Sequence, residues 1–278
     1  MKRLLAAIAL CGVPLLAQQR IVSTAPAITE TLYALGVGAR VVGVSTYCHF
    51  PAEAATKPKI GTYLQPNVEA IIRLKPDLVI IERLAPQALE KLKAAGLRVR
   101  RIDTGNVATN LRMIEDIATA VQLPEAGLAL SKRIATQLAA VEASTASRKK
   151  LRVTFIVGRT PGRLEGIIAV GKGSYLNELI QKAGGTNIFA DSPITYPKIS
   201  LESLVRLQPD VILDMGDMAE TVGVTDAHKR SVEALWRARN EIKGRAQAVA
   251  SDIFVVPGPR MVDAAREFRR IIHGEPPK

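Results

Sequence analysis

Cysteine, histidine and tryptophan are scarce in this 278-residue chain, which has two cysteines, three histidines and one tryptophan. Cys11 lies in an N-terminal segment that we expect to be removed, so Cys48 would be left without a partner for an internal disulfide. The histidines, His49, His228 and His273, are too few and too dispersed for a histidine-rich zinc or manganese site. The sequence therefore predicts neither a disulfide framework nor such a metal centre.

Motifs that mark common enzyme sites are also missing. The sequence has no G-x-S-x-G elbow and no H-E-x-x-H pair. The spacing Gly166-x4-Gly171-Lys172 resembles a phosphate-binding loop, but Gly173 stands where a serine or threonine would bind magnesium, and residues 167–170 are predicted to be a strand. Without a nucleophile–base pair or a metal cluster, we predict no catalytic activity and no catalytic cofactor. The alternative, an enzyme with two α/β lobes, would require such a group.

Aromatic residues make up only 4% of the chain, although its formal net charge is +12. The basic residues are scattered, and Arg148-Lys149-Lys150 is the one tight cluster. Nucleic-acid sites combine clustered basic residues with aromatic stacking partners, so we do not expect nucleic acid as a partner. Nearly half of the residues, 47%, are hydrophobic, which is typical of a globular protein.

One short apolar run stands at the N-terminus. Residues 1–17, MKRLLAAIALCGVPLLA, have a basic start, an apolar middle and the small residue Ala17 at their end. This pattern is typical of a secretory signal peptide, and we expect cleavage after Ala17. Cys11 does not fit a lipoprotein site because Leu10 before it is too large. No other stretch is apolar for 18 residues, so we predict a soluble exported, periplasmic protein.

A 14-residue unit occurs twice. The segment 67–80, NVEAIIRLKPDLVI, matches the segment 200–213, SLESLVRLQPDVIL, at a displacement of 133 positions. Each copy has a polar N-cap and an acidic residue in the first turn, which predict a helix. The Leu-x-Pro step ends this helix, since proline forces the preceding residue out of the α region, and an apolar strand follows. Two copies this far apart predict two related lobes.

The chain alternates between expected strands and helices, which indicates an α/β fold with mainly parallel sheets flanked by helices. A long alanine-rich stretch at 124–148 predicts one helix connecting an N-terminal lobe (18–123) to a C-terminal lobe (149–278). The expected strands are 20–23, 41–44, 78–81, 97–102, 153–157, 167–170, 211–213 and 253–256, and the expected helices are 27–35, 67–74, 86–95, 107–122, 174–183, 200–207, 226–240 and 259–272.

Three of the five tyrosines, Tyr47, Tyr63 and Tyr196, fall in loops beside the predicted strands and repeat helices. In open α/β sheets, ligands bind outside the carboxyl ends of the strands, and these loops are expected there. Large amphipathic rings suit a large, partly apolar ligand. The alternative is that these tyrosines only pack on their own lobes.

Five segments, in order, resemble the substrate-binding proteins of ABC importers for cobalamin, haem and ferric siderophores, and the likeness covers nearly the whole mature chain. That family has two α/β lobes bridged by one long helix (the class III periplasmic binding protein type) and holds its ligand between the lobes. The resemblance is greatest to the cobalamin-binding members. The segments are RIVSTAPAITETLYALGVGARVVGVSTY, NVEAIIRLKPDLVI, VGKGSYLNELIQKAGGTNIF, ITYPKISLESLVRLQPDVIL and VVPGPRMVDA.

The resemblance implies a set of ligand-binding residues. Tyr47, Tyr63 and Tyr196 fall where the cobalamin proteins place aromatic contacts, and Asp252 falls near a polar contact at the rim of the site. The chain departs from those proteins in two ways: they carry tryptophan at the positions of Tyr63 and Tyr196, and one has an aromatic residue where this chain has Glu82. A haem or ferric-siderophore receptor is therefore the alternative, in which Tyr47 or Tyr63 would ligate iron.

Cys48 and His49 are the one pair that suggests contact with the metal of a bound ligand. Adjacent residues in an extended chain point in opposite directions, so we expect at most one of them to reach it.

The resemblance also implies a partner, the permease dimer of an ABC importer, for a monomeric receptor. Glu69 and Glu202 occupy matched positions in the two repeats, where glutamates of this family dock onto the importer. The structural alternative is that each carboxylate only stabilises the N-terminus of its helix.

Overall fold

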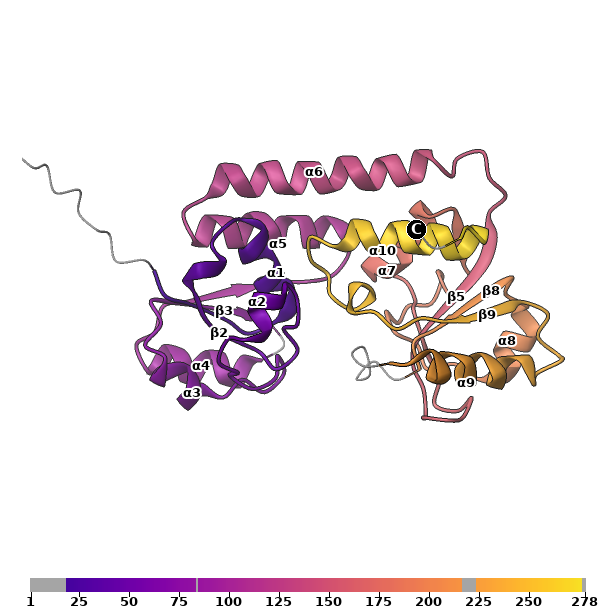
Figure 1. The fold of residues 1–278 in the computed structure, drawn as a ribbon, viewed down its shortest axis with the longest axis horizontal. Helices are drawn as coiled ribbons and strands as arrows, with labels where there is room; N and C mark the ends of the chain where they lie inside the picture. Colours follow the sequence, from indigo (N-terminus) through magenta and orange to yellow (C-terminus); the bar gives the residue numbers. More distant parts are fainter. Residues whose placement is uncertain (1–18, 84, 217–223, 277–278) are drawn as a thin grey trace, which may run out of the picture.

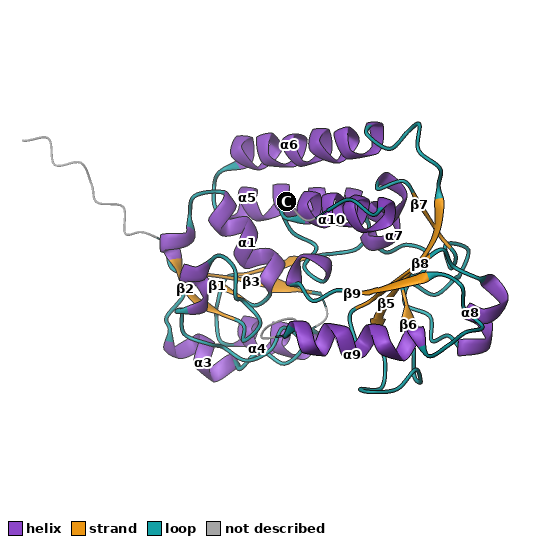
Figure 2. Cartoon of the chain, turned by 45° about the vertical axis from the view of Figure 1, so that its right-hand side comes forward, coloured by secondary structure: helices purple, strands orange, loops and turns teal. Residues whose placement is uncertain are grey.

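The computed structural model describes residues 19–83, 85–216 and 224–276, so the expected signal peptide lies outside the described residues. Two β-sheets, each with helices on both faces, are joined by the long helix α6, Pro124–Ala143 (Figures 1 and 2). We call the part that holds the first sheet lobe 1 and the part that holds the second lobe 2. This arrangement confirms the predicted fold class. No helix in the described ranges is both long and apolar enough to cross a membrane.

Lobe 1 has a parallel sheet in the order β2-β1-β3-β4. Strand β3 is buried along its whole length because helices cover both faces of the sheet, α1 and α5 on one side and α3 and α4 on the other (Figure 1). The four predicted strands are confirmed, with ends shifted by at most two residues. The elements are β1 (Ile21–Ser23), α1 (Pro26–Ala34), η1 (Gly38–Arg40), β2 (Val41–Val44), α2 (Ala52–Ala55), α3 (Val68–Arg73), β3 (Leu78–Glu82), α4 (Pro86–Ala94), β4 (Val99–Ile102) and α5 (Val107–Ala120).

Lobe 2 repeats this arrangement. Its parallel strands follow the order β7-β5-β8-β9, and the short strand β6 pairs antiparallel with the far end of β5. The elements are β5 (Leu151–Gly158), β6 (Ile168–Ala169), α7 (Tyr175–Lys182), β7 (Gly185–Asn187), α8 (Leu201–Leu207), β8 (Val211–Asp214), α9 (Asp226–Arg237), β9 (Arg245–Ala248), η2 (Asp252–Phe254) and α10 (Met261–His273).

The sequence repeat has the same local structure in both lobes. The side chains of Asn67 and Ser200 cap α3 and α8 by accepting a hydrogen bond from the backbone N–H three residues later, at 2.9 and 3.2 Å. Each helix is followed by a residue with positive φ, Lys75 at 45° and Gln208 at 43°. Because both residues precede a proline, they are kept out of the helical region.

The similarity extends to β1 and β5, the first strand of each lobe. The backbone N–H of Arg20 donates to Asp77 Oδ2 at 2.7 Å, and that of Arg152 donates to Asp210 Oδ2, also at 2.7 Å. Both arginine side chains also donate to the carbonyl that ends the repeat helix, at 2.8 and 2.6 Å. These contacts attach the start of the first strand of each lobe to its repeat.

The strand expected at 253–256 is wrong. This apolar stretch begins with the 3-10 helix η2, because the Ser251 side chain accepts a hydrogen bond from Ile253 N–H, and Phe254 is buried in the core. The fourth strand of the sheet is instead β9, whose sequence, Arg245–Ala248, has no run of large apolar residues. It is a partly exposed edge strand that forms by pairing with β8, so its own sequence signal is weak.

Helix α6 is shorter than the predicted 124–148 segment. It ends at Ala143 because the hydroxyl groups of Ser144 and Thr145 donate to the carbonyls of the last turn, at 2.6 and 3.0 Å. Its buried face includes the four residues expected from helical spacing, Leu130, Ile134, Leu138 and Val141, together with Gly127 and Ser131.

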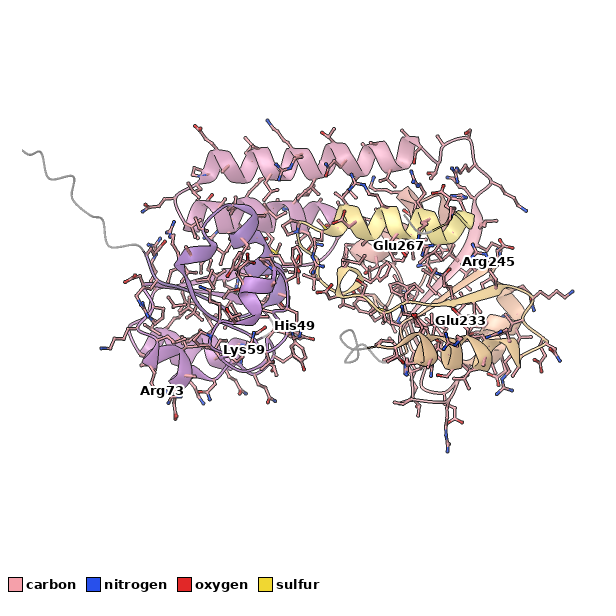
Figure 3. All side chains as sticks on the ribbon, in the orientation of Figure 1. His49, Lys59, Arg73, Glu233, Arg245 and Glu267 are labelled. Atoms are coloured by element: carbon pink, nitrogen blue, oxygen red, sulfur yellow. The ribbon has the colours of Figure 1, made fainter. Side chains whose placement is uncertain are left out.

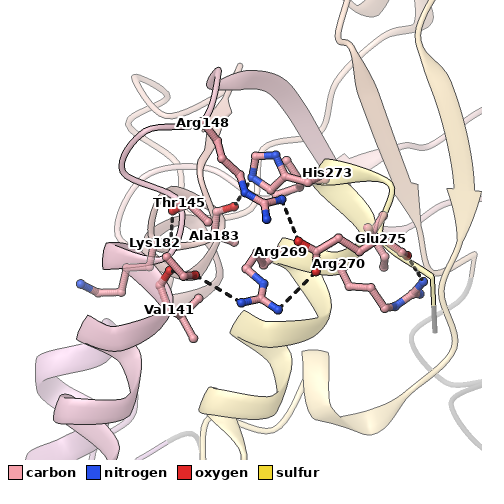
Figure 4. A network of polar contacts seen from close by, with 12 residues as sticks. Val141, Thr145, Arg148, Lys182, Ala183, Arg269, Arg270, His273 and Glu275 are labelled. Atoms are coloured by element: carbon pink, nitrogen blue, oxygen red, sulfur yellow. Dashed lines mark hydrogen bonds and ion pairs between the residues drawn. The ribbon is translucent and has the colours of Figure 1, made fainter. Parts of the chain in front are cut away.

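Polar contacts fix the end of α6 to α7 and α10 (Figure 4). Thr145 Oγ1 donates to the carbonyl of Lys182 at 3.2 Å, and the Arg269 guanidinium donates to Ser144 Oγ at 3.3 Å. Glu275 pairs with both Arg148, at 2.7 Å, and Arg269, at 3.2 Å. The connecting helix is therefore attached to lobe 2 by side chains as well as by the chain itself.

Binding of a ligand between the lobes should produce only a small tilt of one lobe against the other. A helix packed on both lobes bends but cannot open as two extended linkers can. Hydrogen bonds also cross the junction, from Tyr175 N–H to the carbonyl of Gly105 at 3.3 Å and from Val107 N–H to Glu178 Oε2 at 3.2 Å. Small-angle scattering of free and ligand-saturated protein should give nearly equal radii of gyration, and a large compaction would contradict this.

Candidate functional site

The first part of the candidate site is a pair of tyrosine rings in lobe 1. Tyr47 follows β2, and Tyr63 lies in the loop that leads to α3. Their ring centroids are 5.8 Å apart with an interplanar angle of 62°, an edge-to-face contact. Tyr47 keeps 45% of its surface exposed, so the pair presents an aromatic face to solvent.

Tyr196 brings a third ring from lobe 2 to this place. Burial raises the pKa of the Tyr63 hydroxyl, and electrostatic interactions with Glu82, Tyr47 and Tyr196 raise it further. Tyr196 is 44% exposed, and its hydroxyl is hydrogen-bonded to Ser174 Oγ at 3.2 Å. Of the predicted ligand-binding residues, Tyr47 and Tyr63 are in direct contact, and Glu82 and Tyr196 interact electrostatically with Tyr63.

The position of Tyr196 depends on a close backbone contact. Gly171 N–H donates to the carbonyl of Thr195 at 2.8 Å, and a Cβ atom at Gly171 would lie 2.3 Å from the carbonyl oxygen of Ile194. Only glycine allows this approach. Below the loop, the buried Tyr175 donates its hydroxyl to the carbonyl of Phe254 at 2.9 Å and so anchors the start of α7.

Glu82 is the last residue of β3. Its residue surface is only 8% exposed, and burial raises the pKa of its carboxyl group to about 7. Within the part of the chain that the structure describes, this carboxyl group forms no hydrogen bond or ion pair. Its oxygens are not fully enclosed, so they can hydrogen-bond to solvent or to a bound group.

Asp252 does not present a free carboxylate. Both of its oxygens accept hydrogen bonds from Arg260, each at 2.9 Å. The same guanidinium binds Glu30 of α1, including a contact of 2.9 Å from Nε, and lies 4.1 Å from the centre of the Phe50 ring. Arg260 thus joins lobe 2 to lobe 1.

This junction was missed in the sequence, although one signal was present. Glu30 is an acidic residue in the otherwise uncharged helix PAITETLYA, and its side chain is 2% exposed. Burial raises the pKa of Glu30, opposed by its hydrogen bond and ion pair with Arg260. An acidic residue on a buried helix face indicates a basic partner elsewhere in the fold.

The side chains of Cys48 and His49 lie in different surroundings, as expected for neighbours in the chain. Cys48 is fully buried in the core of lobe 1, with its thiol hydrogen-bonded to Thr29 Oγ1 and Ser45 Oγ, both at 3.2 Å. Burial raises the pKa of this thiol, so it stays protonated and does not reach a ligand between the lobes. His49 is exposed, on the side of lobe 1 that faces lobe 2 (Figure 3). No cluster of three or more potential metal ligands exists in the described ranges.

Glu69 and Glu202 both lie exposed in the first turns of their helices, α3 and α8. Hydrogen bonds from its own backbone N–H and from the Ser200 hydroxyl lower the pKa of Glu202. The two glutamates thus occupy equivalent surface positions on the two lobes.

Comparison with known proteins agrees with the fold. The chain is 30% identical over 256 residues to the vitamin B12-binding protein of Vibrio cholerae, covering 90% of this chain and 87% of that one, and 29% identical to that of Salmonella typhimurium, covering 91% and 90%. Among solved structures, the V. cholerae vitamin B12 binding protein BtuF has a TM-score of 0.75 at 28% identity, covering 92% of this chain and 97% of its own.

Haem-binding proteins have the same fold. The periplasmic haem-binding protein RhuT from Roseiflexus sp. RS-1 superimposes with a TM-score of 0.76 at 26% identity, covering 93% of this chain and 99% of its own. The profile of the periplasmic binding protein family matches residues 21–248 of this chain. With this match over most of its length and relatives that align almost end to end, the chain belongs to the periplasmic binding protein family.

Proposed function

We propose that this protein is an exported receptor that binds a corrinoid, cobalamin or a close relative, between its two lobes and delivers it to an ABC importer. The observation that carries the proposal is the Tyr47–Tyr63 pair at the carboxyl edge of the first sheet, together with the exposed ring of Tyr196 in lobe 2. Relatives named as vitamin B12-binding proteins support the choice of ligand. Export from the cytoplasm follows from the signal-like segment 1–17 and the family name.

Binding requires no chemical step. The Tyr47–Tyr63 pair offers an aromatic face in lobe 1, and Tyr196 offers another ring from lobe 2. A corrin ring with an apolar surface and a polar rim would pack against these faces, and the phenol groups would serve as hydrogen-bond partners at its edge. The protein's part is to hold these side chains in place before the ligand arrives.

Haem is the second candidate ligand, because haem-binding proteins share the fold and tyrosine can ligate iron. Iron ligation needs the phenolate, which a bound ferric ion itself promotes by displacing the phenol proton. Packing against a corrinoid needs no ionisation.

Absorbance titration of the purified protein with cyanocobalamin, haemin and a ferric siderophore separates these ligands. We expect saturable binding of cyanocobalamin only, and mass spectrometry of ligand retained from the native source should identify a corrinoid. Binding of haemin with no binding of cyanocobalamin would overturn the proposal.

Replacing Glu69 and Glu202 with alanine should weaken docking and transport without changing ligand affinity. We infer that a two-fold symmetric permease presents one basic socket to each lobe, where arginine can grip a carboxylate through paired hydrogen bonds. The double variant should transport less than either single variant in reconstituted membranes, and docking should weaken with salt.

Glu125→Ala is the matched control, because Glu125 is also an exposed glutamate in the first turn of a helix, on the far side formed by α6. Normal transport by the double variant would leave Glu69 and Glu202 with a structural role only.

A further inference from the structure

Glu82 is a largely buried residue whose carboxyl oxygens remain open to solvent and have no partner among the described residues. Its surface is 8% exposed, and its carboxyl group makes no hydrogen bond or ion pair among the residues that the structure describes. Burial of most of the residue makes ionisation of the carboxyl group costly, and its open oxygens can accept a hydrogen bond from a further donor. At a binding site, such a carboxyl group is suited to accept a hydrogen bond from a donor on the ligand.

The surroundings of Glu82 place it at the ligand site. It ends β3 at the carboxyl edge of the sheet, and its charge acts on the Tyr63 phenol. Arg83 and Asp103, which follow β3 and β4, pair with each other at 3.9 Å on the surface, with side chains 71% and 52% exposed, and Arg100 and Arg101 of β4 are also exposed. Burial accounts for the raised pKa of Glu82, and no nearby cation stabilises its charge.

We propose that the Glu82 carboxylate accepts a hydrogen bond from a side-chain amide of the bound corrinoid and thereby selects amide-bearing ligands over chelates whose rim carries carboxylates. This inference rests on the proposed function and adds the chemical basis of its specificity. An amide N–H supplies the donor that Glu82 lacks, as a charge-assisted hydrogen bond. A ligand carboxylate in the same place would put two negative charges together in a site of low dielectric constant.

The selection also depends on pH. The pKa of Glu82 in the free protein is about 7, so an amide donor that binds the ionised form gains affinity as the pH rises through 7. A ligand carboxylate, which stays ionised above pH 6, binds better when Glu82 is protonated and loses affinity over the same range. The preference for the amide should therefore increase between pH 6 and pH 8.

The test compares cyanocobalamin with its monocarboxylic acids, in each of which one peripheral amide has been hydrolysed. We expect at least one acid to bind the parent protein roughly tenfold or more weakly than cyanocobalamin at pH 8. In Glu82→Gln this difference should largely disappear, along with its pH dependence, because glutamine keeps an acceptor for the amide and adds a donor for the carboxylate. Binding of cyanocobalamin itself should weaken in Glu82→Gln at pH 8, because a neutral amide oxygen is a weaker acceptor than a carboxylate, and circular dichroism shows whether the variant is folded.

Asp103→Asn is the matched control, since it removes the same charge from a nearby exposed position and should leave the ratio of affinities unchanged. An equal ratio in the parent and in Glu82→Gln would overturn the inference while leaving the proposed function intact. Failure of the parent to bind cyanocobalamin at all would overturn both.

Discussion

Alanine substitution of Tyr47, Tyr63 or Tyr196 should weaken cobalamin binding roughly tenfold or more for each residue, and the triple variant should bind more weakly than any single one. Each change removes a large ring from a place where rings of the two lobes gather, and Tyr47 and Tyr63 also support each other through their edge-to-face contact. Titration calorimetry or absorbance titration gives the dissociation constants.

Phenylalanine at the same three positions is the control, because it keeps the ring and removes only the hydroxyl. We expect the Tyr47 and Tyr63 phenylalanine variants to bind more tightly than the corresponding alanine variants. Tyr196→Phe also loses the hydrogen bond to Ser174, so it reports how far that bond positions the ring. If the triple alanine variant binds cobalamin as well as the parent, the ligand site lies elsewhere.

Loss of Arg260 should have the largest effect on stability. Its guanidinium binds Glu30 of lobe 1 and Asp252 of lobe 2, and the side chains of Arg260 and Glu30 are only 14% and 2% exposed. Removing one partner of a buried ion pair leaves the other charge uncompensated, so Arg260→Gln should lower the free energy of unfolding by about 3 to 5 kcal/mol. Urea unfolding followed by circular dichroism measures this change.

Two further variants show whether the ion pair is the cause. Arg266 pairs with Asp263 on the surface, with side chains 51% and 53% exposed, so Arg266→Gln should cost less than about 1 kcal/mol. Adding Glu30→Gln to Arg260→Gln should recover part of the loss, because it removes the uncompensated charge. Equal stability of Arg260→Gln and Arg266→Gln would show that the junction between the lobes does not depend on this residue.

Short-range patterns were sufficient to predict the repeated helix–strand unit. The caps Asn67 and Ser200 act on N–H groups three residues away, and each proline restricts its immediate neighbour, so this information lies within the segment itself. The place of Tyr47 and Tyr63 followed from a general property of parallel sheets, whose carboxyl ends meet at one edge. These features are determined by the sequence with little help from the rest of the fold.

Other elements depend on partners that no local pattern reveals. Strand β9 forms because β8 provides hydrogen-bond partners for Arg245–Ala248, whereas the more apolar residues near Phe254 pack into the core as a 3-10 turn. Periodicity alone favoured the apolar stretch as the strand, since hydrophobicity indicates burial and not which backbone conformation achieves it.

Some features of the candidate site likewise follow from the local sequence, and others depend on contacts between distant parts of the chain. The sequence by itself indicated that Tyr47, Tyr63 and Tyr196 stand in loops beside the strands, and the family resemblance added Glu82, the last residue of β3. Only the tertiary structure decided that Cys48 is buried, that Arg260 binds the carboxylate of Asp252, and that Glu82 has no partner among the described residues. Glu30 and Arg260 are 230 positions apart, and a contact or its absence at such a separation depends on how the whole chain packs.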